Sequence, residues 1–126
     1  MFFYYFMLIS SIFIPILMHI IGIILSKKPP KWINDYYGYR TKRSKMNQKT
    51  WDFAQVYIGK IWSRLSLILL LISIVPFIYL TDSKEDTLAV VGFILMMIQV
   101  VIMSLTIVPV EKALKKLIDE DKDTLK

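Results

Sequence analysis

Three long apolar blocks divide the chain, and they set the first expectation about its architecture. They cover residues 2–25, 61–80 and 88–110, and Arg64 is the one charged residue inside them, although the chain has 16 Lys and Arg and 10 Asp and Glu. About 20 helical residues, each rising 1.5 Å, cross the hydrocarbon core of a bilayer. Each block is long enough, and in lipid only a helix satisfies its own backbone. The pattern predicts three transmembrane helices.

The polar segments that follow the first and third blocks also carry helical periodicity. Between residues 48 and 62, apolar and amide side chains recur at steps of three and four, which predicts a helix from Gln48 through Gly59 into the second span, with Asn47 as its N-cap. In the tail 111–126, Val110, Leu114 and Ile118 share one helical face, so the tail is expected to extend the third helix. We therefore expect an all-α integral membrane protein with a single domain over 1–126, in which a small bundle of three helices carries a structured basic cytoplasmic loop.

Composition supports a membrane protein and excludes several other classes. The hydrophobic fraction is 56%, more than a small soluble domain can bury. The chain has no Cys, so it is neither a disulfide scaffold nor a Cys-ligated metal protein. The first block has no Lys or Arg before Lys27 and no small-residue cleavage site, so it is expected to be a retained span and not a signal peptide.

The distribution of Lys and Arg predicts the orientation. The segment 26–60 holds nine of them and the tail 111–126 holds five, whereas the segment 81–87 holds Lys84 alone. Because the basic side of a membrane protein faces the cytoplasm, the N-terminus is expected outside and the C-terminus inside. The Lys- and Ile-rich usage is typical of an AT-rich bacterium, so the expected location is the bacterial plasma membrane.

Polar residues inside the blocks are candidates for function because they are costly in lipid. These are His19, Arg64 and Gln99. Structural alternatives are a His bonded to a neighbour, an Arg that reaches lipid phosphates, and an interhelical hydrogen bond from Gln99. No Asp or Glu lies within a block, which disfavours proton-coupled transport and an intramembrane catalytic triad. No catalytic residue, metal or cofactor is expected.

The segment 26–60 offers the chemistry of an anion site. Arg40 has a planar fork suited to phosphate or carboxylate. The candidates for the other polar groups of such a site are Asn34, Thr41, Ser44 and Asn47. We expect this loop to fold back on the bundle with Trp32, Tyr36 and Trp51 partly buried, and Arg64 to approach it. The alternative is that positive charge and interfacial aromatic anchors alone account for the composition.

A motif in this segment resembles the signature of the SdpI family of small membrane proteins. The family pattern reads N-x3-GYRT-x2-S-x2-N-x3-W-x2-AN-x3-G, and this chain departs from it only at Gln55, where the family usually has Asn. The matching positions are Asn34, Gly38, Tyr39, Arg40, Thr41, Ser44, Asn47, Trp51, Ala54 and Gly59. The layout of three spans also fits, and the chain resembles the minimal version of the family. The resemblance implies immunity, because the namesake protects its producer from a secreted membrane-active peptide.

Three readings of function remain open. The first is an immunity protein that binds a toxin peptide or a membrane lipid. The second is a signalling adaptor that holds a cytoplasmic repressor at the membrane, a role also implied by the resemblance. The third is an enzyme or carrier for a phosphate-bearing envelope lipid, with Arg40 and Arg64 as ligands. Direct nucleic-acid binding is disfavoured, since topology already accounts for the basic charge. The pair Gly22 and Ser26 leaves room for a homodimer.

Overall fold

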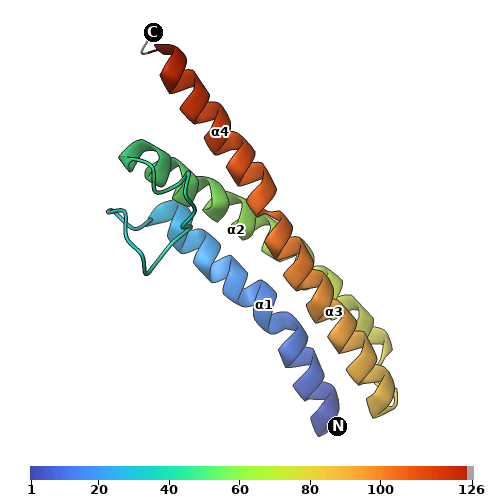
Figure 1. The fold of residues 1–126 in the computed structure, drawn as a ribbon. Coiled ribbons are helices and arrows are strands. Elements are labelled where there is room, and N and C mark those ends of the chain that lie inside the picture. Colours follow the sequence, from blue (N-terminus) through green and yellow to red (C-terminus); the bar gives the residue numbers. More distant parts are fainter. Residues whose placement is uncertain (125–126) are drawn as a thin grey trace.

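The computed structural model describes residues 1–124 and is helical throughout apart from its connections. The helices are α1 (Phe2–Lys27), α2 (Gln48–Tyr79), α3 (Glu85–Leu105) and α4 (Ile107–Thr124). Figure 1 shows α1, α2 and α3 packed side by side, with α4 continuing the direction of α3 beyond the ends of α1 and α2. No strand occurs within residues 1–124. The predicted all-helical bundle is confirmed; the last two residues of the predicted tail lie outside the described part.

Three segments are long and apolar enough to cross a membrane: Phe2–Lys27, Gln48–Tyr79 and Glu85–Asp123. Their outward faces carry large apolar side chains such as Ile9, Leu71 and Phe93, which are exposed in the isolated chain. Exposed apolar surface on this scale is stable only against another apolar phase. The chain is a multi-pass membrane protein.

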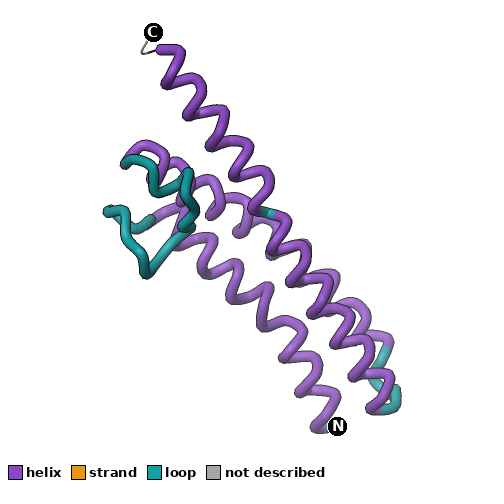
Figure 2. Tube along the Cα trace, viewed as in Figure 1, coloured by secondary structure: helices purple, strands orange, loops and turns teal. Residues whose placement is uncertain are grey.

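The long helix α2 begins where the sequence predicts. The side chain of Asn47 accepts a hydrogen bond from the Thr50 amide at 2.9 Å, and the Thr50 hydroxyl accepts one from the Asn47 amide at 3.0 Å. This reciprocal pair is a capping box, which satisfies amides that the first helical turn leaves without partners. From there α2 continues without interruption through Gly59 into the second apolar block (Figure 2).

Two glycines let α1 and α2 approach each other closely. A Cβ added at Gly22 would lie 2.6 Å from the Ser63 amide nitrogen, and one added at Gly59 would lie 2.5 Å from the Ser26 amide nitrogen. Backbone atoms fill both places, so any side chain there would force the helices apart. The Gly22 face is thus occupied by α2 of the same chain, and the Gly22–Ser26 pair does not support a dimer.

The third span is interrupted once, at Thr106. Pro109 has no amide hydrogen to donate to the carbonyl of Leu105 and its ring crowds that carbonyl, which accounts for a break at this point. The indole of Trp62 on α2 donates to the Thr106 hydroxyl at 3.0 Å, and that hydroxyl donates to the Met103 carbonyl at 2.5 Å. The predicted extension of the third helix into the tail is present, but it begins after this break.

Buried hydrogen bonds join the three spans in the middle of the bundle. The Gln99 amide group on α3 donates to the Ser11 carbonyl of α1 at 2.7 Å and to the Ser73 hydroxyl of α2 at 2.5 Å. Nearer the loop end, His19 Nδ1 lies 3.0 Å from both the Ser63 carbonyl and the Ser66 hydroxyl. The structural alternatives expected for Gln99 and His19 are the ones that the structure forms.

A binding site beneath the basic loop

The connection between α1 and α2, residues 28–47, is called the basic loop here, and one glutamine of α2 holds its centre. The Gln55 side-chain oxygen accepts from the Tyr39 amide at 2.6 Å, and the Gln55 side-chain nitrogen donates to the Tyr39 carbonyl at 2.8 Å. Gln55 itself is fully buried. A side-chain amide that pairs with both backbone groups of one residue replaces the partners that a strand would supply. The position where the motif departs from the family therefore fastens the loop to the bundle.

Gly38 makes this close approach geometrically feasible. Its φ of 107° lies in the region that favours glycine, and an added Cβ would lie 2.7 Å from the Gln55 side-chain oxygen and 2.9 Å from Pro30 Cγ. Next to it, the indole of the fully buried Trp51 donates to the Pro30 carbonyl at 2.8 Å. The start and the centre of the loop are thereby held against the same face of α2.

Hydroxyl groups organise the rest of the second half of the loop. The buried Ser44 hydroxyl accepts from the Thr41 amide at 2.8 Å and lies 3.0 Å from the Tyr39 and Thr41 carbonyls. The Thr50 hydroxyl on α2 donates to the Ser44 carbonyl at 3.1 Å. Ser44 and Asn47, which were expected to face a ligand, are thus used in folding the loop.

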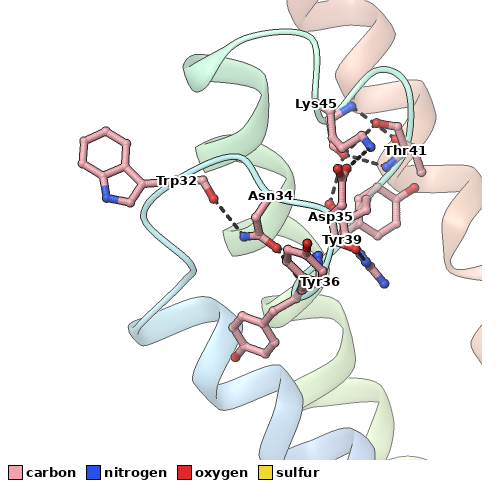
Figure 3. A network of polar contacts seen from close by, with 10 residues as sticks. Trp32, Asn34, Asp35, Tyr36, Tyr39, Thr41 and Lys45 are labelled. Carbon is pink, nitrogen blue, oxygen red and sulfur yellow. Dashed lines mark hydrogen bonds and ion pairs between the residues drawn. The ribbon is translucent and has the colours of Figure 1, made fainter.

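The first half of the loop is largely exposed, and beyond its hydrogen bonds to α2 at Pro30 and Lys31 it is held by local contacts. The Asn34 side-chain oxygen accepts from the amides of Tyr36 and Tyr37 at 2.9 and 2.7 Å, forming a turn on its own backbone (Figure 3). Trp32 and Tyr36 are 73% and 91% exposed. The expectation that Trp32 and Tyr36 are partly buried is wrong, because the turn at Asn34 directs them outward; the expected burial of Trp51 is confirmed.

A cavity of about 540 Å³ lies between the loop and the helices. Its apolar walls come from α1, α2 and the third span around the break, and its loop side is formed by the residues from Tyr36 to Thr41. The residues that the argument below uses are Ile21, Leu25, Tyr39, Arg40, Trp62 and Ile107. Ligand sites in proteins are typically clefts of about 300–1,000 Å³ with apolar walls and few polar groups. The motif segment Gly38–Thr41 therefore covers a site of suitable size for a ligand.

Arg40 contributes the only charge among the described residues that line this cavity. Its guanidinium donates to the main-chain oxygen of Asp35, whereas the Asp35 carboxylate forms an ion pair with Lys45 at 2.8 Å. Lys45 holds the pKa of Asp35 below its usual value through this hydrogen bond and its charge, and Arg40 adds a smaller effect. Because Lys45 engages the carboxylate, Arg40 keeps donors for another anion.

Tyr39 links the cavity to α4. Burial raises the pKa of its phenol to about 12, and the negative charge of Glu111 on α4 adds to the effect. The Tyr39 hydroxyl and one Glu111 carboxylate oxygen are both buried without a hydrogen-bond partner in the described structure. The phenol is therefore neutral at ordinary pH and packs mainly as an apolar ring against the core formed by Leu25, Ala54 and Ile58.

The remaining candidates lie elsewhere. Arg64 is exposed on α2 and forms no hydrogen bond or ion pair with residues 1–124, so the expected contact between Arg64 and the loop is not formed. Since its side chain points out of the bundle near the end of a span, it fits a group that reaches the lipid interface. His19 and Gln99 bond within the bundle. No cluster of three metal-ligating side chains occurs in the described residues.

The sequence did not identify Trp62, Ser104 and Thr106 as site residues, although all three line the cavity. Trp62 was interpreted as an interfacial anchor. The break at Thr106, which brings its hydroxyl to the Trp62 indole, follows from Pro109 three residues later. Pro109 was the feature of the sequence that could have indicated this break.

Comparison with known proteins agrees with these observations. The model of the SdpI/YfhL protein family matches residues 31–110, which is more than half of the chain and includes most of the basic loop and the second and third spans. The chain belongs to the SdpI/YfhL family. It is also similar to the uncharacterized protein YfhL of Bacillus subtilis (strain 168), with 51% identity over 41 residues, 32% of this chain. The match covers 37% of the length of that relative. No solved structure matches the chain.

Proposed function

We propose that this protein protects the cell that makes it against a secreted membrane-active peptide. Membership of the SdpI/YfhL family supports this role. The observation that carries it is the arrangement of the basic loop, because its motif residues form a firmly bonded cover over a cavity and leave Arg40 as the charged group at that cavity. We place the loop on the cytoplasmic side, on the grounds of the nine Lys and Arg in the segment 26–60 that contains it.

Survival of a sensitive bacterium tests the proposal. Cells that produce the protein, and cells that carry the empty vector, are challenged with a panel of membrane-active peptides. We expect producing cells to survive at least one peptide that kills the others. Equal killing across the panel would contradict the protective role. Reporter fusions at Lys126 and in the segment 81–87 test the orientation, and an external C-terminus would contradict it.

Arg40 provides the residue-level test. Arg40→Lys keeps the positive charge, so insertion is expected to be normal, but it removes the fork that binds an anion through two hydrogen bonds. We expect protection to fall in Arg40→Lys and further in Arg40→Ala, at unchanged membrane abundance. Arg43→Lys and Arg43→Ala are the matched controls, since Arg43 is in the same loop but does not line this cavity. Full protection by both Arg40 variants would reduce Arg40 to a topology signal.

A second candidate function is a signalling adaptor, and a groove between the loop and α4 favours it. The groove has a net positive charge of two, since four basic and two acidic residues line it beside the apolar Met46 and Ile118. The charged residues are Lys42, Arg43, Lys115, Lys122, Glu111 and Asp119. Such a surface suits an acidic segment of a cytoplasmic protein. The double variant Lys115→Glu and Lys122→Glu is expected to change host transcription if the protein signals, whereas Lys112→Glu and Lys116→Glu, outside the groove, are the control. Identical transcript profiles would contradict signalling through this surface.

A further inference from the structure

The cavity beneath the basic loop lies at the level where the three apolar blocks end. Ile21 and Leu25 belong to the last turns of the first block, Trp62 to the first turn of the second, and Ile107 to the last turn of the third. One wall of the cavity is therefore the part of the bundle that lies beside the headgroup ends of the lipid chains. The opposite wall is a polar loop. A ligand that fills it must be apolar at one end and polar at the other.

The charge at the polar end selects the sign of that ligand. Arg40 is the single charged residue among the described residues of the cavity lining, and its guanidinium uses one main-chain acceptor, the oxygen of Asp35. A guanidinium carries five N–H donors, and its planar fork matches phosphate oxygens. Arg40 is exposed on the loop, so an uncharged ligand would leave its remaining donors to water, whereas an anion would engage them in charge-assisted hydrogen bonds.

We propose that the cavity binds one phospholipid of the adjoining leaflet, with an acyl chain between the helices and the lipid phosphate on Arg40. Free phosphate would satisfy Arg40 but would leave the exposed side chain of Ile107 in the apolar wall uncovered. A phospholipid satisfies both ends at once, and the bilayer supplies it at the depth where the cavity lies. The proposal does not depend on the protective role, because a resident lipid is present with or without a toxin.

Native mass spectrometry of the purified full chain tests this directly. The protein in detergent is titrated with phosphatidylglycerol and, separately, with diacylglycerol that carries the same acyl chains. We expect one phosphatidylglycerol to bind per chain, about tenfold more tightly than diacylglycerol, since a hydrogen bond to a charged group contributes enough for a factor of ten. Equal binding of the two lipids would overturn the phosphate contact.

Two pairs of variants locate the lipid. Arg40→Gln is expected to weaken phosphatidylglycerol binding about tenfold. Lys31→Gln, the same charge change at an exposed loop residue that lines neither the cavity nor the groove against α4, leaves binding within twofold. Ile107→Trp places a large ring in the lining and is expected to abolish binding, whereas Val108→Trp, at an exposed neighbour that does not line the cavity, leaves it unchanged. Both Trp substitutions are at exposed positions, so folding is preserved.

Several results would overturn the proposal. Equal losses in Arg40→Gln and Lys31→Gln would show that only net charge matters, and full binding by Ile107→Trp would place the lipid elsewhere. Displacement of phosphatidylglycerol by inorganic phosphate at equal concentration would identify a site for a free anion. Binding of a membrane-active peptide by lipid-free protein that retains no phospholipid would assign the cavity to a peptide. These measurements use no toxin challenge, so they fail or succeed separately from the survival test.

Discussion

The two halves of the basic loop differ in how they are built and in composition: residues 28–37 hold two Lys and three aromatic residues, whereas residues 38–47 hold four Lys and Arg and one aromatic residue. Residues 28–37 meet α2 near their start, where the Trp51 indole donates to the Pro30 carbonyl, and otherwise depend on a local turn at Asn34 that leaves the rings of Trp32 and Tyr36 exposed. Residues 38–47 are fastened to α2 through Gln55 and Thr50 and include the fully buried Ser44. The hydroxyl and amide groups of the second half are thus largely used in folding the chain. At the cavity this leaves one cation, Arg40, for recognition.

Gln55→Leu is the strongest test of the difference between the halves. It leaves the Tyr39 amide without a partner and removes one of the two donors to the Tyr39 carbonyl, which still accepts from Ser44. A buried unsatisfied group costs about 1–3 kcal/mol and a lost hydrogen bond about 0.5–1.5 kcal/mol, so we expect the free energy of unfolding to fall by about 1.5–4.5 kcal/mol. Amide exchange in nanodiscs would accelerate in residues 38–47 and stay unchanged in residues 31–37, whose turn is held by Asn34. Gln55→Asn, the usual family residue, keeps the amide with a shorter reach and is expected to lose less.

Gly38→Ala tests the contact between Gln55 and the loop from the loop side. A residue with a Cβ is strained at a φ of 107°, and that Cβ would meet Gln55 and Pro30. The expected destabilisation is about 1–3 kcal/mol, measured by thermal unfolding in detergent. Gly92→Ala is the control, because its added Cβ would meet the flexible end of the Met7 side chain and no backbone atom. A larger loss for Gly92→Ala than for Gly38→Ala would contradict the role of Gly38.

The phenol of Tyr39 makes the second half sensitive to alkaline pH. Its pKa is raised to about 12 from an ordinary value of 10.0, so the folded state keeps a proton that the unfolded state loses. Stability from this group is complete below pH 10 and falls as the pH rises through about 12. Difference spectra between wild type and Tyr39→Phe are expected to show the absorbance of the Tyr39 phenolate rising with a midpoint near pH 12. A midpoint near the ordinary pKa of 10.0 would contradict the burial of this phenol.

Changes in the first half are expected to have the smallest effect on stability. Trp32→Ala and Tyr36→Ala remove exposed rings, and surface substitutions usually change the free energy of unfolding by less than about 0.5 kcal/mol. The measurement is the unfolding temperature in detergent beside that of Gln55→Leu. A loss in Tyr36→Ala as large as that in Gln55→Leu would show that the two halves are fastened alike.

The sequence predicted those features that depend on local pattern. The spans, the capped start of α2 and the helical tail follow from periodicity, hydrophobicity and capping residues, and the structure forms all of them. The contacts across the loop were not predictable in this way. Gln55 and Tyr39 are 16 positions apart, and nothing in their types indicates that they pair. Likewise, the Gly22–Ser26 spacing predicts a close helix contact but does not say whether the partner is α2 or a second copy.

The same limit explains why the positions expected for Trp32, Tyr36 and Arg64 are wrong. A ring at the membrane boundary is equally compatible with burial beneath a loop or with contact with lipid, and the turn at Asn34 decides the matter for Trp32 and Tyr36. Arg64 has no acid within its span, which indicated that it needed a partner. Which side of α2 lies against α1, however, is set by the packing of Gly59 against α1. That packing directs Arg64 away from the bundle.

The break at Thr106 gives the third span the mechanics of a lever. With a rise of 1.5 Å per residue, the far end of α4 at Thr124 lies about 26 Å from this fulcrum, so a rotation of about 10° there displaces it by about 4–5 Å. Near the fulcrum α4 is seated by the buried Val110 and Leu114; farther out, the exposed ion pair of Lys49 and Asp121 at 2.7 Å braces it, and such pairs contribute less than about 1 kcal/mol. Trp62 and Ile107 line the cavity and flank this point, so any tilt of α4 that accompanied a change in what the cavity holds would be largest at the tip of α4.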